Sequence, residues 1–475
     1  MARPFVSCSP SVLVAAGAIA LMAMAAAQPA SKTASKASSP PVTTSKPWTG
    51  DFDGMFERRN IRMLAPYSRT LFFLEKGQAH GLTADLAHDF ETYLNKKHAK
   101  ELGGRRITVG LIPTTRDKLL TGLVAGMGDI SGGNLTATAS RMQTADFVAP
   151  TERDPALELL VSGPGAPAIA TLDDLSGKKV NVRQASSYFE SLNALNDKLR
   201  AANKPPLQIV TMPDALEDED VLEMLNAGLF DYTVVDSWKA KLWAQTVPQI
   251  KVHDDIVLRT GGTIGWAIRK QSPKLRAELE GFYRIASQQG LIQARLENYQ
   301  ASLKEIANTY TGPASKRFEQ TLTLFRNYGK QYSFDPLMLA AEGYQESQLE
   351  QNAGSPAATS AALTTSPSGE QLAQDVQNRT KYIDQLMTQS FADAKFSELD
   401  RTWFTFASYK SGADKISRMR KEAAKRGLDP NQWFNNVELV TAENYGMSST
   451  AYVRNILKYR VAYKLISEAE AGQTK

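Results

Sequence analysis

Short apolar runs alternate with amphipathic stretches over the first half of the chain, and this alternation limits the fold more than any other feature. The runs resemble β-strands in length and composition, and the stretches carry apolar residues at helical spacing. The runs cover 61–65, 107–112, 128–130, 179–182, 207–210, 232–236 and 265–268, and the stretches cover 82–93, 116–125 and 187–199. Strands alternating with helices indicate an α/β domain with mostly parallel sheets, which we place at 48–300.

The pattern changes after Gly290, where the chain becomes helical throughout. Apolar residues at helical spacing cover 291–306, 314–332, 371–392, 399–408, 415–426, 437–444 and 449–466. These segments predict an all-α second domain at 305–475. The chain of 475 residues exceeds one ordinary domain, which agrees with two.

The N-terminus has the pattern of a secretory signal peptide. Arg3 precedes an apolar core at 11–27 that ends in small residues, so we expect a signal peptide at 1–27. An uncleaved membrane anchor is the alternative. Residues 28–47 are rich in Ser, Thr, Lys and Pro and predict a flexible tether. Cys8, the only cysteine, precedes the apolar core, so we predict no lipidation and no disulfide in the mature chain.

Composition argues against several classes of function. The net charge of +5 is too small to indicate nucleic-acid binding. The four histidines, His80, His88, His98 and His253, form no cluster, so we predict no metal and no cofactor. The sequence also contains no glycine-rich phosphate loop.

Two passages of the first half resemble the polar-amino-acid-binding periplasmic proteins. In 134–150, a short strand ending in Thr leads to Arg141 and then to an aspartate-aromatic pair, and 228–238 resembles a segment of the second lobe. The resemblance implies two lobes that close on a ligand, with chain crossings near 150–165 and 255–265. It implies that Arg141 binds the ligand carboxylate and that Asp236 pairs with the ligand ammonium.

Four further polar residues are candidates for this ligand site. Thr136 and Thr138 precede the arginine and are expected to line the pocket. Ser186 and Ser187 lie at a strand-to-helix turn, where hydroxyl and backbone N–H groups can bind an anionic ligand end. The alternative is that the arginine and the aspartate are ordinary structural charges.

A second candidate site lies in the all-α half. Asp335 and Pro336 predict the start of a helix, and Glu346 comes near its far end. The partial negative charge of a helix C-terminus opposes ionisation of a carboxyl group, as burial does. A carboxyl group kept protonated near neutral pH can act as a general acid. A solvated glutamate with no catalytic role is the alternative.

The pair Glu346-Ser347, followed by Ser355-Pro356, resembles the catalytic segment of the soluble-type lytic transglycosylases, which have a goose-lysozyme-like fold. The resemblance implies that Glu346 protonates the glycosidic oxygen between N-acetylmuramic acid and N-acetylglucosamine. It then takes the proton of the muramyl 6-hydroxyl, which closes a 1,6-anhydro ring. Ser347, Tyr409 and Tyr452 would lie in the glycan groove.

The tail and the domain order extend the resemblance. Residues 401–412, 427–438 and 452–459 match other transglycosylase segments, and a binding-protein-like domain before this one resembles membrane-bound lytic transglycosylase F and its relatives. The resemblance implies a periplasmic or outer-membrane-peripheral location and peripheral membrane association. Its implied partners are peptidoglycan and an amino-acid-like or muropeptide ligand.

The sequence departs from the transglycosylase pattern near the expected active site. Leu363 stands near a family methionine, Thr364 near a family glutamine, and Lys410 replaces a family asparagine. These family residues line the groove and position the glycan, and positioning supplies much of the rate. Two hypotheses therefore stay open: a lytic transglycosylase with a ligand-sensing domain, and a catalytically degenerate wall-binding or ligand-sensing protein.

Overall fold

A computed structural model describes residues 46–75, 77–150, 156–306, 335–343, 369–391, 393–446 and 448–473. Its strands are β1 (Asn60–Ala65), β2 (Phe73–Glu75), β3 (Gln78–His80), β4 (Thr108–Pro113), β5 (Ile130–Ala137), β6 (Ala145–Val148), β7 (Ala156–Ser162), β8 (Lys179–Arg183), β9 (Gln208–Met212), β10 (Tyr232–Asp236) and β11 (Lys251–Arg269). The predicted signal peptide and nearly all of the predicted tether lie outside the described residues.

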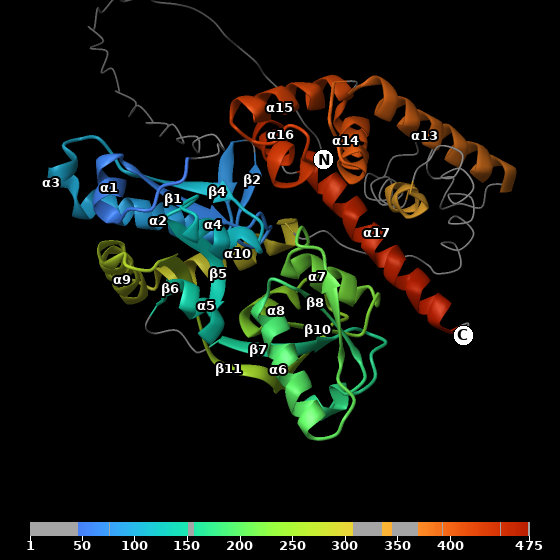
Figure 1. The fold of residues 1–475 in the computed structure, drawn as a ribbon, viewed down its shortest axis with the longest axis horizontal. Helices are drawn as coiled ribbons and strands as arrows, with labels where there is room; N and C mark the ends of the chain where they lie inside the picture. The colour runs from blue at the N-terminus through green and yellow to red at the C-terminus, as the bar shows by residue number, and fades with distance from the viewer. Residues whose placement is uncertain are drawn as a thin grey trace, which may run out of the picture. The chain divides into compact units, whose positions relative to one another are not determined.

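The helices of the first half pack against the faces of these strands (Figure 1). They are α1 (Phe52–Glu57), α2 (Leu82–Lys97), α3 (Ala99–Leu102), α4 (Lys118–Val124), α5 (Ala139–Thr144), η1 (Leu172–Leu175), α6 (Ser187–Ala201), α7 (Asp218–Asn226), α8 (Ser237–Trp243), α9 (Pro273–Gln288) and α10 (Leu291–Ile306).

The described secondary-structure elements of the second half are all helices. Its elements are a helix at 336–343, α13 (Gly369–Gln389), α14 (Glu398–Ser411), α15 (Ala413–Lys425), the π-helical turn η3 (Trp433–Val437), α16 (Glu438–Tyr445) and α17 (Ser448–Gln473). The predicted helix at 314–332 lies outside the described residues.

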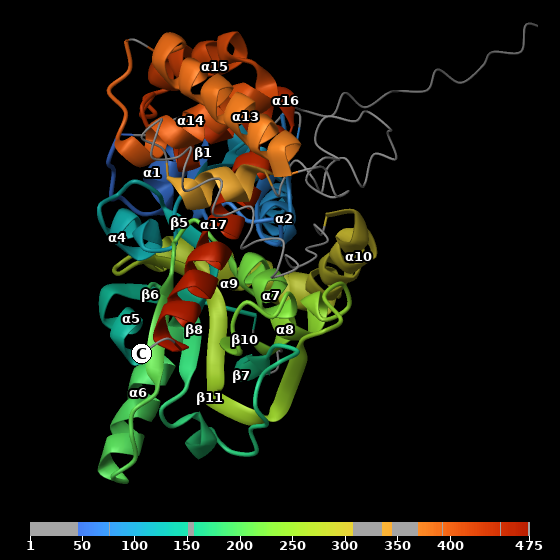
Figure 2. The ribbon, with the colours of Figure 1, turned by 90° about the vertical axis from the view of Figure 1, so that its right-hand side faces the viewer.

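The strands of the first half form two lobes that share one long strand. In the described residues the main sheet has nine strands in the order β4-β1-β5-β11-β7-β10-β8-β9, with β6 also paired to β11. Residues 251–262 of β11 pair with β7, and residues 263–269 pair with β5 and β6. Figure 2 shows β11 running from one lobe into the other. The chain therefore crosses between lobes within the predicted span 255–265.

The expectation of mostly parallel sheets is wrong for half of this sheet. The parallel pairs are β1 with β4 and β5, and β8 with β9 and β10. Strand β11 is antiparallel to β5, β6 and β7, and β7 is antiparallel to β10. The cause is the shared strand: it passes directly from one lobe to the other instead of returning through a helix, as a parallel strand must.

Each lobe has its own hydrophobic core. In the first lobe, Phe90, Trp266 and Phe282 are buried in contact with one another, with ring centroids 5.3–6.1 Å apart. In the second lobe, α6 begins at Ser186, whose side chain accepts a hydrogen bond from the Phe189 N–H and caps the helix. The apolar face of α6 then packs on β8 and β10.

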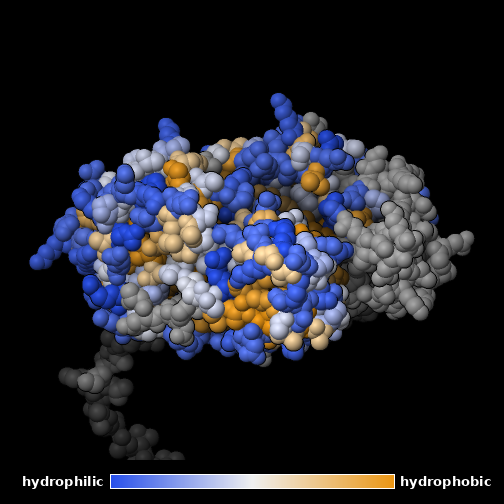
Figure 3. Space-filling view, turned by 60° about the horizontal axis from the view of Figure 1, so that its bottom comes forward, coloured by the Kyte–Doolittle hydropathy of each residue, from blue (hydrophilic) through white to orange (hydrophobic). Residues whose placement is uncertain are grey.

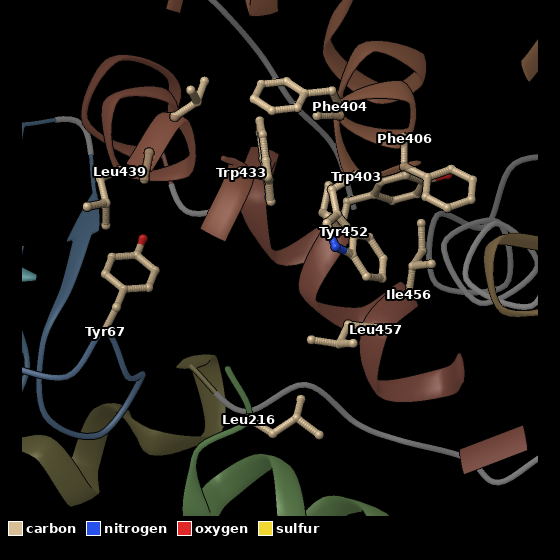
Figure 4. Packing of buried hydrophobic residues seen from close by; sticks show 14 of the residues in the cluster. Tyr67, Leu216, Trp403, Phe404, Phe406, Trp433, Leu439, Tyr452, Ile456 and Leu457 are labelled. Atoms are coloured by element: carbon tan, nitrogen blue, oxygen red, sulfur yellow. The ribbon is translucent and has the colours of Figure 1, made fainter. Parts of the chain in front are cut away.

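A third core lies among the helices of the second half (Figure 4). Trp433 and Phe404 are fully buried, with ring centroids 5.5 Å apart and nearly perpendicular ring planes. Tyr67 and Leu216, from the first half of the chain, belong to the same cluster of buried side chains. The two halves of the chain therefore share buried apolar contacts.

The surface is largely polar. Figure 3 shows one face as mostly hydrophilic, with smaller hydrophobic areas near its centre. Among the described residues, no helix combines the length and apolar character needed to cross a membrane.

Candidate functional site

A small cavity lies at the carboxyl ends of β5, β8 and β10, between the two lobes. It is lined by Arg116, Asn134, Leu135, Thr136, Arg141, Arg183, Ala185, Ser186, Ser187, Tyr188, Asp218, Asp236 and Lys239. The cavity volume is about 20 Å³, which is room for about one water molecule. The lobes are therefore closed on each other here.

Arg141 extends from α5 in the first lobe to the second lobe. Its guanidinium donates hydrogen bonds to the Thr136 carbonyl oxygen at 3.2 Å and to the Ala185 carbonyl oxygen at 3.0 Å. Its Nε lies 3.2 Å from a carboxylate oxygen of Glu190 on α6. Burial lowers the pKa of Arg141, and the Glu190 carboxylate opposes that shift. The predicted carboxylate-binding group thus already holds a carboxylate of the protein.

Asp236 ends β10 and is 2% exposed. One carboxylate oxygen, Oδ2, lies 3.4 Å from the Lys239 ammonium, and the other, Oδ1, is buried without a hydrogen-bond partner. The same ammonium donates to Asp218. Burial opposes ionisation of Asp218, but Arg183 and Lys239 outweigh it and hold the pKa of that carboxyl well below its usual range. The predicted ammonium-binding group thus has an ammonium beside it.

A buried ion pair between the lobes lies beside the cavity. Arg116 follows β4 in the first lobe, and its Nε donates to both carboxylate oxygens of Glu217, at 3.0 and 2.9 Å. Glu217 is the capping residue of α7 in the second lobe. Both side chains are nearly inaccessible, so this pair favours the closed arrangement of the lobes.

Five of the six predicted ligand residues lie together at this cavity. The sixth, Thr138, does not line it. Thr136, Arg141, Ser186, Ser187 and Asp236 line it. Thr138 is instead the capping residue of α5, where its hydroxyl accepts a hydrogen bond from the Arg141 N–H at 3.2 Å. The ligand-binding roles of these residues stay predictions.

Sequence reasoning missed the other charged residues of the cavity, Arg116, Arg183, Asp218 and Lys239. A signal was present, because Arg183 directly follows a predicted strand and Lys239 follows another by three residues. Charged residues just after parallel strands gather at one edge of a sheet. The pairing partners, which come from both lobes, have no such signal.

In the second half, Tyr452 and Tyr409 are described and Glu346 and Ser347 lie outside the described residues. The Tyr452 hydroxyl donates to a carboxylate oxygen of Glu342 at 3.1 Å, and Glu342 is fully buried. The Tyr409 ring stacks beside that of Tyr452, with centroids 6.5 Å apart. Sequence reasoning missed Glu342, an acidic residue on the apolar face of the helix at 336–343.

Lys410 lies beside the Tyr452 ring. Its ammonium is 5.2 Å from the centroid of the Tyr452 ring, in cation–π contact. The residue that replaces the family asparagine therefore contacts one of the two predicted groove tyrosines.

Helix α7 connects the cavity to the second half. Its acidic residues Glu219, Asp220 and Glu223 are buried. Arg69 donates to Asp220 at 3.0 Å and to both oxygens of Glu223, at 2.8 and 2.9 Å. From α17, Lys458 donates to Glu223 at 2.6 Å and lies 3.3 Å from Asp220. One buried acidic cluster thus binds cations from both halves of the chain.

The described residues hold no group of three or more His, Cys, Asp and Glu side chains placed to bind a metal ion.

Comparisons with known proteins give relatives over most of the chain. Membrane-bound lytic murein transglycosylase F of Ectopseudomonas mendocina is 27% identical over 431 residues, which is 84% of this chain and 83% of that protein. The protein of the same name from Erwinia tasmaniensis is 25% identical over 457 residues, 88% of each chain. The resemblance seen in the sequence is confirmed by these relatives.

The solved structures that are similar match the first half. An ancestral arginine-binding protein, solved with arginine bound, is 21% identical, with a TM-score of 0.41, and covers 51% of this chain and 98% of that one. The family model described as bacterial extracellular solute-binding proteins, family 3, matches residues 63–302, which is half of the chain. This chain therefore belongs to the family 3 bacterial extracellular solute-binding proteins.

Proposed function

We propose that this chain is a peptidoglycan lytic transglycosylase. It cleaves the bond between N-acetylmuramic acid and N-acetylglucosamine and leaves 1,6-anhydromuramyl ends. Its similarity to proteins named lytic murein transglycosylase F, over 84% of its length, carries the proposal. The matching sequence Glu346-Ser347 supports it. The all-α half would then have a lysozyme-like fold, and the protein would work in the periplasm or at the membrane periphery.

In this proposal Glu346 serves as the single acid and base. It first donates its proton to the leaving glycosidic oxygen and then accepts the proton of the muramyl 6-hydroxyl as that oxygen closes the ring. The reaction needs no second carboxylate, metal or cofactor. Tyr409, Tyr452 and Ser347 would contact the glycan.

The N-terminal domain would bind a small ligand at the cavity and modulate the catalytic half. The buried contacts of α7 support this part, because Asp218 faces the cavity while Glu223, one turn and a half further along, binds Lys458 of α17. A ligand that moves α7 would move this ion pair.

A second candidate is a wall-binding or ligand-sensing protein without turnover. Lys410 favours it, since the lysine stands where the family has an asparagine and contacts the Tyr452 ring. The test is the rate of release of soluble fragments from purified sacculi by the wild type, Glu346→Gln and the neighbouring control Glu350→Gln. The enzyme hypothesis predicts loss of activity only in Glu346→Gln. Sacculus binding without release by any of the three proteins would favour the second candidate.

A further inference from the structure

The charges around the N-terminal cavity indicate which ligand it accepts. The charged side chains that line it, together with the ion-pair partners of Arg116 and Arg141, are four cations and four anions: Arg116, Arg141, Arg183, Lys239, Glu190, Glu217, Asp218 and Asp236. These charges balance, and each is paired within the protein. A charged group of a ligand can therefore enter without upsetting this balance only if it displaces a side chain of the same charge that can turn out into solvent.

Glu190 is the anion best placed to leave. Its side chain is 33% exposed, whereas those of Glu217, Asp218 and Asp236 are at most 7% exposed. It lies on α6 at the rim and forms an ion pair with Arg141. A ligand carboxylate can take its place on the guanidinium while Glu190 turns into water, and the charge of the cavity stays balanced.

The acidic end of the cavity differs, because Lys239 cannot leave in this way. Its side chain is 4% exposed and it is held by Asp218 as well as by Asp236. Lys239 already supplies the positive charge that Asp236 needs. A ligand ammonium at the open Oδ1 atom would lie within a few ångströms of the lysine ammonium, in a site with little water to screen the two charges.

A neutral donor suits the same atom. The buried Oδ1 of Asp236 has no hydrogen-bond partner, and a buried acceptor left unpaired costs free energy. An amide N–H supplies the hydrogen bond without adding a second positive charge.

We propose that the N-terminal cavity binds an N-acylated amino acid or peptide end, with a free carboxylate on Arg141 and an amide N–H on Asp236, and that Lys239 selects against free amino acids. This inference rests on the proposed ligand-binding role of the cavity. Because the cavity holds about one water molecule, the ligand enters as the lobes open.

The test compares matched ligands by isothermal titration calorimetry on the mature full-length protein. The ligands are alanine, leucine, glutamine and phenylalanine, each as the free L-amino acid and as the N-acetyl derivative. We expect at least one N-acetyl form to bind at least tenfold more tightly than its free form. In Lys239→Met, that ratio should fall at least tenfold, since the ammonium that repels the free amino group is gone. Lys241→Met, which removes an exposed lysine of the same helix, should keep the wild-type ratio.

The wild-type comparison does not depend on whether a variant folds. Wild-type protein that binds the free forms as tightly as the acetylated forms, or that binds neither, overturns the proposal. So does an unchanged ratio in a folded Lys239→Met protein. Sacculus digestion tests the transglycosylase separately, so an active enzyme with no preference for acylated ligands refutes this inference alone.

Discussion

Replacement of Lys458 by methionine should destabilise the protein, because it leaves a buried negative charge. The Lys458 side chain is 2% exposed and binds Glu223, which is fully buried, and Asp220. In the wild type, Lys458 and Arg69 balance these two carboxylates. Removal of one partner of a buried ion pair costs about 3–5 kcal/mol. Since Arg69 still binds both carboxylates, we expect the lower end, about 3 kcal/mol.

Glu223→Gln should partly rescue Lys458→Met. In the double variant one cation, Arg69, again faces one of these two carboxylates, Asp220, and the third buried acid, Glu219, is the same in every variant. We expect the double variant to lose about 2 kcal/mol less than the sum of the two single variants, which is within the range for side chains in contact. The measurement is urea unfolding followed by tryptophan fluorescence and far-UV circular dichroism, with Lys464→Met as the control on the exposed side of α17.

The pH dependence gives an independent check. Burial opposes ionisation of Asp220, but Lys458 and Arg69 outweigh it and lower the pKa of Asp220 to about 2. A carboxyl group whose pKa is lower in the folded state stabilises the protein above about pH 4, and this contribution is lost as the pH falls toward 2. In Lys458→Met the pKa of Asp220 should rise toward its unfolded value, so the stability lost between about pH 4 and pH 2 should be smaller than in the wild type. Additive single and double variants, with an unchanged acid transition, would refute the reasoning.

Three other substitutions test the packing. Phe404→Ala should lower the free energy of unfolding by about 3–5 kcal/mol because it empties a fully buried site, whereas Leu399→Ala, at a 52% exposed site, should change it by less than about 0.5 kcal/mol. Gly265→Ala should cost about 2 kcal/mol or more, since the new Cβ would lie 2.3 Å from a backbone carbonyl oxygen, and Gly165→Ala, with no atom near its Cβ, is the control. Tyr452→Phe should cost about 1 kcal/mol through loss of its buried hydrogen bond. Urea unfolding measures all three.

The sequence predicted most of the local structure of the first half, because hydrophobic periodicity reports burial directly. The run at 179–182 is β8 within one residue, and 232–236 is β10. Strand β11 was recognised only at its end, 265–268. Its first part alternates polar and half-buried residues around His253 and contains Gly261, a pattern that is typical of a loop. Only the pairing with β7 makes this part a strand.

Helix α7 was missed for a different reason. Acidic residues occupy its whole first turn, and such a run is normally solvated. Here Asp218, Asp220 and Glu223 are buried because cations reach them from distant parts of the chain, including Lys458. Periodicity carries no information on partners so far away in the sequence.

The candidate site was predictable only in part. Arg141 and Asp236 were found by resemblance, and the structure brings them to one cavity. Their present partners, Glu190 and Lys239, are ordinary residues of helices in the sequence. Closure of the two lobes places Glu190 beside Arg141, whereas Lys239 follows Asp236 by three residues in the same lobe.

The central claim, that the chain is a lytic transglycosylase, is tested most directly by the chemistry of its products. Purified peptidoglycan is digested in water enriched in heavy oxygen, and the released muropeptides are weighed by mass spectrometry. We predict anhydro products, lighter by one water than hydrolysed ones and free of the label, from the wild type and not from Glu346→Gln. Labelled, hydrolysed products from the wild type, or no products at all, would contradict the claim.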